Sequence, residues 1–260
     1  MNNSLITVIT VTHGRTHLLQ RAIDTVKRQT ISDKVHHFIY IDDCPDTLDF
    51  LKENYSDDLS ISWFYYHRKK EDISGPSLLA RLRNDAVMKS KGMWLSYLDD
   101  DNEFESDHLE KLYKFAISNN YSAVHSYVKV FNRDGTPYLF TQEKWPWSRD
   151  EKSKQKYEMM LNNGLVEKGS NIRKYRYGIV IDTNVWLVKR EIWEHCQIPD
   201  FFSTQDWENN LAEDDKLMEE MIRQEVEVHT NEEASVIYYL GGYSNSFDGK
   251  EKGTIIWEKV

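Results

Sequence analysis

The sequence has few cysteines and no long apolar runs. Its 260 residues include only two cysteines, Cys44 and Cys196, too few for a disulfide framework and without the spacing of a zinc site. No apolar run reaches the roughly 18 residues of a membrane-spanning helix, and no cationic leader precedes the first apolar segment. We therefore expect a soluble, cytoplasmic protein, and we leave open a peripheral contact with the inner membrane face.

Basic residues are also scarce. The 33 Lys and Arg are outnumbered by 43 Asp and Glu, and the formal net charge is −10. This balance argues against broad, non-specific adhesion to nucleic acid, although it leaves specific binding open. Residues 144–176 are an exception, because nine basic and four acidic residues occur there together with Trp145 and Trp147. This basic segment is consistent with either a solvated surface excursion or a binding lid.

Two phosphate-binding motifs are missing. No Gly-x-Gly-x-x-Gly follows the first apolar run, and no Gly-x-x-x-x-Gly-Lys-Ser/Thr occurs anywhere. Both motifs bind phosphate through backbone amides at the start of a helix. Their absence argues against dinucleotide oxidoreductases and P-loop enzymes.

Apolar periodicity predicts an α/β fold. Strands are predicted at 5–11, 35–41, 60–66 and 92–98, where β-branched and aromatic residues are frequent. Helices are predicted between them at 18–26, 46–54 and 76–90, with Thr16 as the N-cap of the first. This alternation predicts a largely parallel sheet with helices on both faces.

The second half of the chain is less regular. A hairpin is predicted from strands at 123–131 and 136–141 around the turn sequence Asn-Arg-Asp-Gly. Further strands are predicted at 178–188, 226–229 and 234–240, and helices after Arg190 and at 213–225. We interpret residues 1–260 as a single domain.

Acidic residues follow two of the predicted strands. Asp42 and Asp43 follow the second strand, and the triplet Asp99, Asp100 and Asp101 follows the fourth. Crowded carboxylates repel one another, so they are usually retained for a cation or a function. The side-chain period of a strand predicts that Asp99 and Asp101 point to the same side, and carboxylates are preferred ligands of Mg²⁺ and Mn²⁺. A solvated acidic turn is the alternative.

These features occur in a characteristic order along residues 1–120. The order is Ile6-Thr-Val-Ile-Thr-Val-Thr12, Arg15, Gln29-Thr30, Ile41-Asp-Asp43, Arg83-Asn84 and Leu98-Asp-Asp-Asp-Asn102. In this respect the sequence resembles family 2 glycosyltransferases of the GT-A fold. The resemblance implies a Rossmann-like, mostly parallel sheet flanked by helices, with a smaller antiparallel extension.

The resemblance also implies a function. Such enzymes move a sugar from a nucleotide diphosphate donor, commonly a UDP-sugar, to a hydroxyl acceptor with the help of Mn²⁺ or Mg²⁺. Residues 1–120 would form the nucleotide-sugar half of the domain, and 121–260 would form the acceptor half. The sequence does not identify the sugar, the oligomeric state or the acceptor, which can be a glycan, a lipid-linked molecule or another hydroxyl compound.

Site residues follow from the same resemblance. Thr12 and Asp43 would contact the nucleotide base, with Arg15, Arg83 and Asn84 nearby. Alternatives exist for three of them: Asp43 can cap the following helix, Arg83 can be an exposed helix cation, and Asn84 can be an ordinary polar surface residue.

The aspartate triplet would form the metal and diphosphate end of the donor site. By resemblance, Asp101 is the preferred direct metal ligand and Asp99 a second one. Asp100 would lie closest to the ribose or to the metal shell.

A second acidic pair, Glu213 and Asp214, occurs at the predicted start of a helix. It resembles the family's Glu-Asp pair, in which the aspartate takes the proton of the acceptor hydroxyl. Asp214 would be this base, with Glu213 orienting it or contacting the acceptor. Favourable electrostatics at a helix N-terminus is the alternative role. Direct attack opposite the nucleotide predicts inversion at the anomeric carbon.

One departure concerns histidine. Many relatives carry a histidine after the last core strand, whereas Tyr238-Tyr-Leu-Gly-Gly-Tyr-Ser244 has none. His229 is the nearest candidate, and its strand-like surroundings favour a structural or surface role over metal binding. The predicted metal shell is therefore incomplete.

Two other functions fit part of the pattern. A nucleotidyltransferase of related fold is one, with His13-Gly-Arg15 as a short version of its basic loop. A non-catalytic nucleotide-sugar-binding protein is the other, and the presence of both acidic sets argues against it.

Overall fold

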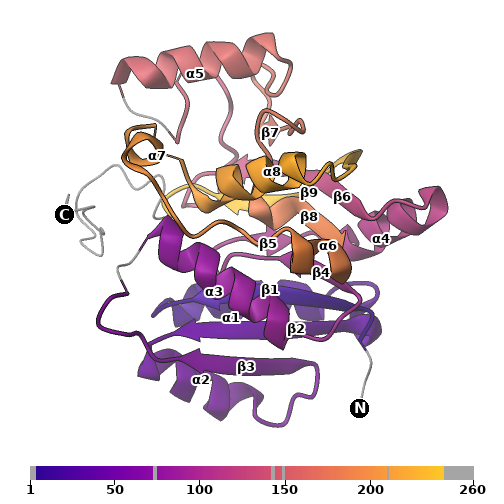
Figure 1. Ribbon diagram of the computed structural model, residues 1–260. Coiled ribbons are helices and arrows are strands. Elements are labelled where there is room, and N and C mark those ends of the chain that lie inside the picture. The colour runs from indigo at the N-terminus through magenta and orange to yellow at the C-terminus, as the bar shows by residue number, and fades with distance from the viewer. Residues whose placement is uncertain (1–3, 73–74, 142–143, 148–149, 210, 243–260) are drawn as a thin grey trace.

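The first half of the chain forms four parallel strands. The computed structural model describes residues 4–72, 75–141, 144–147, 150–209 and 211–242 (Figure 1). The elements before the aspartate triplet are β1 (Ile6–Thr12), α1 (Thr16–Lys27), β2 (Val35–Asp42), α2 (Pro45–Tyr55), β3 (Ile61–Tyr66), α3 (Pro76–Lys89) and β4 (Trp94–Tyr97). The strands lie in the order β3-β2-β1-β4, and every neighbouring pair is parallel. The predicted α/β fold is confirmed.

The second half extends this sheet with strands of mixed direction. Its elements are β5 (Glu103–Phe104), α4 (His108–Asn119), β6 (Ala123–Phe131), α5 (Asp150–Asn162), β7 (Ile172–Arg173), β8 (Trp186–Lys189), α6 (Arg190–His195), α7 (Thr204–Glu208), α8 (Glu213–Arg223) and β9 (His229–Tyr239). The sheet continues from β4 in the order β8-β6-β9-β5, and β7 pairs with β6. Antiparallel pairs join β4 to β8 and β8 to β6, whereas β6 and β9 are parallel.

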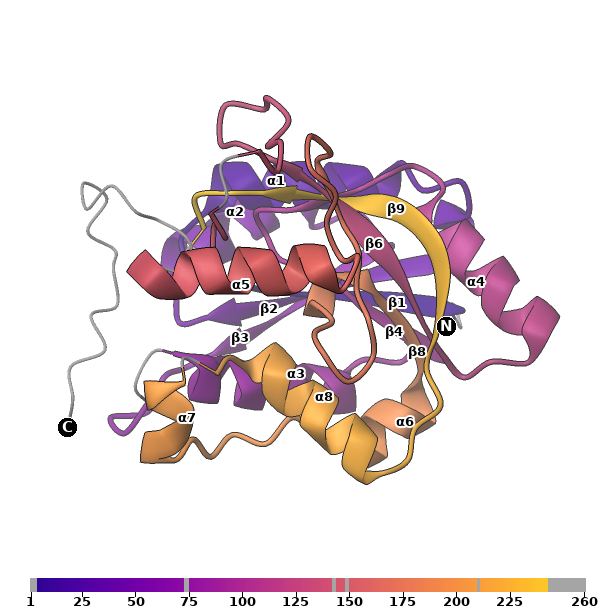
Figure 2. The ribbon, with the colours of Figure 1, turned by 90° about the horizontal axis from the view of Figure 1, so that it is seen from above.

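Helices cover both faces of the sheet. Figure 2 shows α1 and α2 on one face and α3, α6 and α8 on the other, while α5 lies above the edge opposite β3 in Figure 1. The apolar face of α1 buries Leu19, Ala22, Ile23 and Val26, whose spacing is helical. Full burial of each larger aliphatic side chain stabilises the fold by about 1.5–3 kcal/mol.

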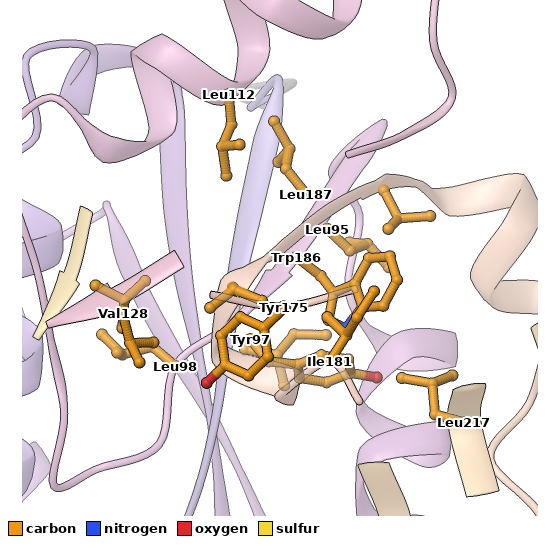
Figure 3. Packing of buried hydrophobic residues seen from close by; sticks show 14 of the residues in the cluster. Leu95, Tyr97, Leu98, Leu112, Val128, Tyr175, Ile181, Trp186, Leu187 and Leu217 are labelled. Atoms are coloured by element: carbon orange, nitrogen blue, oxygen red, sulfur yellow. The ribbon is translucent and has the colours of Figure 1, made fainter. Parts of the chain in front are cut away.

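The core continues beneath the second half of the chain. Tyr97 at the end of β4 packs edge to face on Trp193 of α6, with ring centres 5.1 Å apart. Figure 3 shows Tyr97, Tyr175 and Ile181 gathered near Leu217 of α8. The end of β4 and helix α8, which begins at Glu213, therefore belong to the same hydrophobic core.

Close approach of two strands requires a glycine at the start of β4. The amide of Gly92 donates to the Thr7 hydroxyl at 2.9 Å, and a Cβ at position 92 would lie 2.5 Å from the Thr7 backbone nitrogen. Only glycine leaves that space empty.

Four local predictions need correction. Helix α1 begins at Thr16 itself, and Arg15 precedes it without a side-chain cap bond. The predicted second strand of the hairpin, 136–141, is reduced to an isolated bridge between Phe131 and Pro137. Strand β7 pairs with β6 at Val128 and Lys129. Strand β8 occupies only the end of the predicted 178–188 run, and β9 replaces the two strands predicted near the C-terminus. Among the described residues, every helix is too short or too polar to cross a membrane.

Candidate active site

The aspartate triplet lies beside the end of β1. Strands β1 and β4 are parallel neighbours, so their carboxyl ends meet at one edge of the sheet. The Thr10 hydroxyl donates to the carbonyl of Leu98 at 2.7 Å, and the Thr12 hydroxyl donates to Asp100 Oδ2 at 2.6 Å. Thr12 and the triplet, predicted to share a site, are therefore in direct contact.

Arg15 binds two members of the triplet. Its Nη1 donates to Asp101 Oδ2 at 2.8 Å, and its Nε and Nη2 donate to the two oxygens of Asp100. Burial raises the pKa of Asp100 to about 7, an effect that Arg15 opposes and Asp101 reinforces. Burial also raises the pKa of Asp101. The side chains of Arg15 and Asp101 remain 25% and 17% exposed, so this ion pair can be reached from solvent.

Asp99 is bound by a different arginine. Arg83 of α3, 2% exposed, donates from Nη2 to Asp99 Oδ1 and from Nη1 to Glu213 Oε1, each at 2.6 Å. The alternative role of Arg83 as an exposed helix cation is therefore wrong. Strand β4 ends at Tyr97, and the Asn102 amide closes a turn onto the carbonyl of Asp99. The period-two argument for placing Asp99 and Asp101 on one side does not apply within this turn.

Asn184 and Asp182 complete the surroundings of Asp99. The Asn184 side chain accepts from the Asp99 amide at 2.6 Å and donates to Asp99 Oδ2 at 2.8 Å and to Asp182 Oδ1 at 2.7 Å. Burial and the charge of Asp99 raise the pKa of Asp182. Sequence reasoning missed both residues. The sequence feature that could have identified them is the polar stretch Asp182-Thr-Asn184 inside the apolar run 178–188.

The acids at the start of α8 have three different partners. Asp215 Oδ2 accepts from the Ala212 amide at 2.9 Å and so caps the helix, and Glu213 binds Arg83. The Asp214 carboxylate accepts only the amide of Asp215, and no cation binds it among the described residues. Burial raises the pKa of Asp214 well above its usual value, and the charges of Asp215 and Glu213 raise it further. Helix capping thus falls to Asp215, and Asp214 keeps a carboxylate able to accept a proton.

Asp43 follows β2 at the same edge of the sheet. It has a φ of 43°, and its Oδ1 accepts from the Tyr65 hydroxyl at 3.2 Å. Its neighbour Asp42 is bound by Arg68 at 2.7 and 2.6 Å. Helix α2 has Cys44 as its N-cap and no side-chain cap bond, so the alternative role of Asp43 as a helix cap is wrong. The Asp43 side chain is 39% exposed and can accept hydrogen bonds from a ligand.

Asn84 binds the backbone of Ile198. Its Nδ2 donates to the Ile198 carbonyl at 2.8 Å, and its Oδ1 accepts from the Ile198 amide at 2.9 Å. This pair of bonds ties α3 to the segment between α6 and α7. Asn84 therefore has a structural role, and its predicted contact with a nucleotide stays a prediction.

The chain after β9 returns to the aspartate triplet. The Tyr239 amide donates to Asn102 Oδ1 at 3.1 Å, and a Cβ at position 242 would lie 2.8 Å from Asp101 Oδ2. Glycine at position 242 therefore allows the backbone to pass against Asp101. His229 lies at the other end of β9, where it stacks on Tyr121 with ring centres 3.5 Å apart. It does not complete a metal shell at Asp101.

The triplet offers two carboxylates to a metal. Among the residues that the structure describes, no three Asp, Glu, His or Cys side chains are grouped as metal ligands. Asp99 and Asp101 are 35% and 17% exposed. Mg²⁺ typically uses one or two carboxylates and takes its other ligands from phosphate oxygens and water. Asp99 and Asp101 are thus of the chemical type that a divalent metal binds, and at present each is paired with an arginine.

Comparison with known proteins identifies the family. Residues 7–177 match the family model described as Glycosyl transferase family 2. The protein belongs to this family. A search of curated protein sequences finds no match.

Solved structures of glycosyltransferases share the fold of this family 2 chain. S. aureus TarS is 14% identical with a TM-score of 0.59, over 92% of this chain and 37% of TarS. TarS 1–349 in complex with UDP-GlcNAc is 13% identical with a TM-score of 0.57, over 90% of this chain and 58% of that one. Mannosyltransferase PcManGT from Pyrobaculum calidifontis, in complex with GDP-Man and Mn²⁺, is 15% identical with a TM-score of 0.57, over 90% and 56%. The chain thus spans about 37% to 58% of the length of these structures.

Proposed function

We propose that the protein transfers a sugar from a nucleotide diphosphate donor to an acceptor hydroxyl. The observation that carries the proposal is the state of Asp214, a partly buried carboxylate that no cation of the described residues binds, next to a Glu213 that Arg83 holds in place. A general base works best when its pKa lies near the working pH, and burial raises the pKa of Asp214 in that direction.

The donor is proposed to lie along the carboxyl ends of β1, β2 and β4. Thr12 and Asp43 would contact the base, and Arg15, Asp99 and Asp100 would contact the ribose and the diphosphate. We favour a UDP-sugar, which is supported by the complexes of TarS 1–349 with UDP and with UDP-GlcNAc. The complex of PcManGT with GDP-Man makes a GDP-sugar the second choice.

A divalent metal is proposed at Asp101 and Asp99. Support comes from the exposure of both carboxylates and from the Mn²⁺ in the PcManGT complex. When bound, Mn²⁺ or Mg²⁺ supplies positive charge that stabilises the departing diphosphate.

The reaction is proposed to be one displacement with inversion. The acceptor hydroxyl gives its proton to Asp214 while its oxygen forms a bond with the anomeric carbon. The bond from that carbon to the diphosphate oxygen breaks, and its electron pair leaves with the nucleotide diphosphate. Arg83 donates a hydrogen bond to Glu213 and so holds it beside the base.

Product analysis tests this proposal. The protein is incubated with Mn²⁺ and, in separate reactions, with UDP-GlcNAc, UDP-glucose or GDP-mannose, and nucleoside diphosphate release is measured. Release from one donor class supports glycosyl transfer. Pyrophosphate formed from a nucleoside triphosphate would instead identify a nucleotidyltransferase, and donor binding without turnover would identify a binding protein.

A further inference from the structure

Arg173 occupies an aromatic enclosure in the basic segment. It lies on β7, pairs with Val128 of β6 and is 6% exposed. Its guanidinium carbon is 4.5 Å from the ring centre of Trp147, 5.0 Å from that of Trp145 and 4.8 Å from that of Tyr175. Three aromatic faces thus surround one buried cation.

Within the described part of the chain, the guanidinium of Arg173 has no hydrogen-bond acceptor. Among the described residues, no carboxylate, carbonyl or hydroxyl accepts from it, and its buried Nε is without a partner. A guanidinium carries five N–H donors, and aromatic faces attract its charge without replacing those hydrogen bonds. Arg83 is buried to a similar degree, and two carboxylates bind it. The enclosure therefore stabilises the charge of Arg173 and leaves its donors available.

A second donor in the enclosure is also unpartnered. Tyr175 is 3% exposed, and its hydroxyl has no hydrogen-bond partner in the described part of the chain. The indole of Trp147, by contrast, donates to the Tyr238 hydroxyl at 3.1 Å. Buried polar groups are nearly always hydrogen-bonded, and here two groups without partners belong to side chains in contact, 4.8 Å apart from guanidinium carbon to ring centre.

The charge of Arg173 acts on the proposed base. The charge of Arg173 lowers the pKa of Asp214 and of Asp182, against the raising effect of burial. Burial raises the pKa of Tyr175 well above its usual value; the charge of Arg173 opposes this rise, and the charges of Asp182 and Asp214 add to it. None of these carboxylates forms an ion pair with Arg173 within the described residues, so they lie near it without occupying its donors.

We propose that Arg173 and Tyr175 bind an oxyanion, a phosphate or a carboxylate, carried by the acceptor. The guanidinium presents two parallel N–H groups to such an anion, the tyrosine hydroxyl gives a third donor, and Trp145 and Trp147 form the walls. The excess of basic residues at 144–176 attracts an anionic acceptor. The inference rests on the proposed function, because Asp214 as the base is what makes this the acceptor side.

Anion binding can be tested without turnover. Inorganic phosphate, acetate and the neutral control glycerol are titrated into the nucleotide-free protein, with calorimetry and tryptophan fluorescence as readouts. We expect saturable binding of phosphate or acetate. The anion with the higher affinity indicates whether the acceptor carries a phosphate or a carboxylate. Arg173→Gln should weaken that binding about tenfold or more. Tyr175→Phe, which removes one oxygen atom, should weaken it about threefold.

Two controls locate the anion. Arg176→Gln makes the same charge change three residues away, at an exposed side chain that donates to the Asn163 carbonyl, and should bind the anion as the unmodified protein does. Arg15→Gln reports on the donor site. Loss of binding in Arg15→Gln with full retention in Arg173→Gln would place the anion at the donor site and overturn the proposal.

Other outcomes are equally decisive. Absence of saturable binding by the unmodified protein, or unchanged binding in both Arg173→Gln and Tyr175→Phe, would overturn it. Should Arg173→Gln not fold, Tyr175→Phe decides. Nucleotide release by the unmodified protein is measured separately, so an anion site without turnover would overturn only the proposed function, and turnover without an anion site would overturn only this inference.

Discussion

Two arginines neutralise the acids at the carboxyl end of the sheet, and they do so in different ways. Arg83 is 2% exposed and joins the turn after β4 to the start of α8 through Asp99 and Glu213. The Arg15 side chain is 25% exposed and binds two successive carboxylates of one turn, Asp100 and Asp101. Arg83 therefore ties the two halves of the chain together, whereas the Arg15 pairs stay within the first half, and the pair with Asp101 is partly exposed to solvent.

The largest expected effect is at Asp214, which neither arginine binds. Asp214→Asn removes the proton acceptor and should lower kcat by about 10²- to 10⁴-fold, because a positioned base contributes that much. Nucleotide-sugar affinity, measured by calorimetry, should stay the same. Asp215→Asn makes the same charge change one residue away, at the helix cap, and should keep kcat within a few-fold. Equal losses of kcat in both variants would remove Asp214 from its role.

Loss of each arginine should affect stability unequally. Arg83→Gln leaves two carboxylates without their buried cation and should lower the free energy of unfolding by about 3–5 kcal/mol. Arg15→Gln should lower it by about 1 kcal/mol, because Arg15 is more exposed and Asp100, with a pKa of about 7, can take up a proton instead. Urea denaturation measures both. Similar losses of unfolding free energy in the two variants would show that both sets of ion pairs contribute equally to stability.

Substitutions of Asp101 and Asp99 should differ in how far they reduce the effect of Mn²⁺ on UDP affinity. Mn²⁺ should tighten UDP binding to the unmodified protein, and Asp101→Asn should reduce this effect about 10- to 100-fold. Asp99→Asn should reduce it less, since Arg83 and Asn184 already hold that carboxylate. Calorimetry with and without Mn²⁺ gives the comparison. A UDP affinity that Mn²⁺ does not change would argue against a metal at either residue.

A modest effect, on stability alone, is expected at Asn84, the neighbour of Arg83. Asn84→Ala removes both hydrogen bonds to Ile198 and should lower the free energy of unfolding by about 1–3 kcal/mol. If Asn84 acts only through this structural contact, UDP affinity stays unchanged. A loss of UDP affinity at full stability would instead assign it to the nucleotide site.

Much of the fold could be predicted because its first half repeats one local pattern. Buried parallel strands such as β1 and β2 read as continuous β-branched runs, and α1 and α3 show helical spacing. The second half departed from prediction where pairing is decided over long distances. Residues 136–141 carry a hairpin signal, yet β7 pairs with β6 over part of its length. Local strand propensity does not show which of two segments will pair with β6.

Within the candidate site, residue types were easier to predict than partners. The triplet, Thr12 and the acids of α8 stand out because charges at strand and helix ends are visible in the sequence. Asp182 and Asn184 were missed because they lie inside an apolar run; Asn184 binds Asp99, and Asp182 binds Asn184. Arg173 was counted within a basic segment, and its aromatic enclosure has no local signature.

By itself, the sequence determined which side chains stand at the ends of strands and helices, because periodicity and end signals are local. Only the tertiary structure decided how they pair. Arg15 lies 86 residues from Asp101, and Arg83 lies 130 residues from Glu213. Those pairings depend on how the sheet brings distant segments of the chain together, whereas the capping of α8 by Asp215 is a contact between residues three apart.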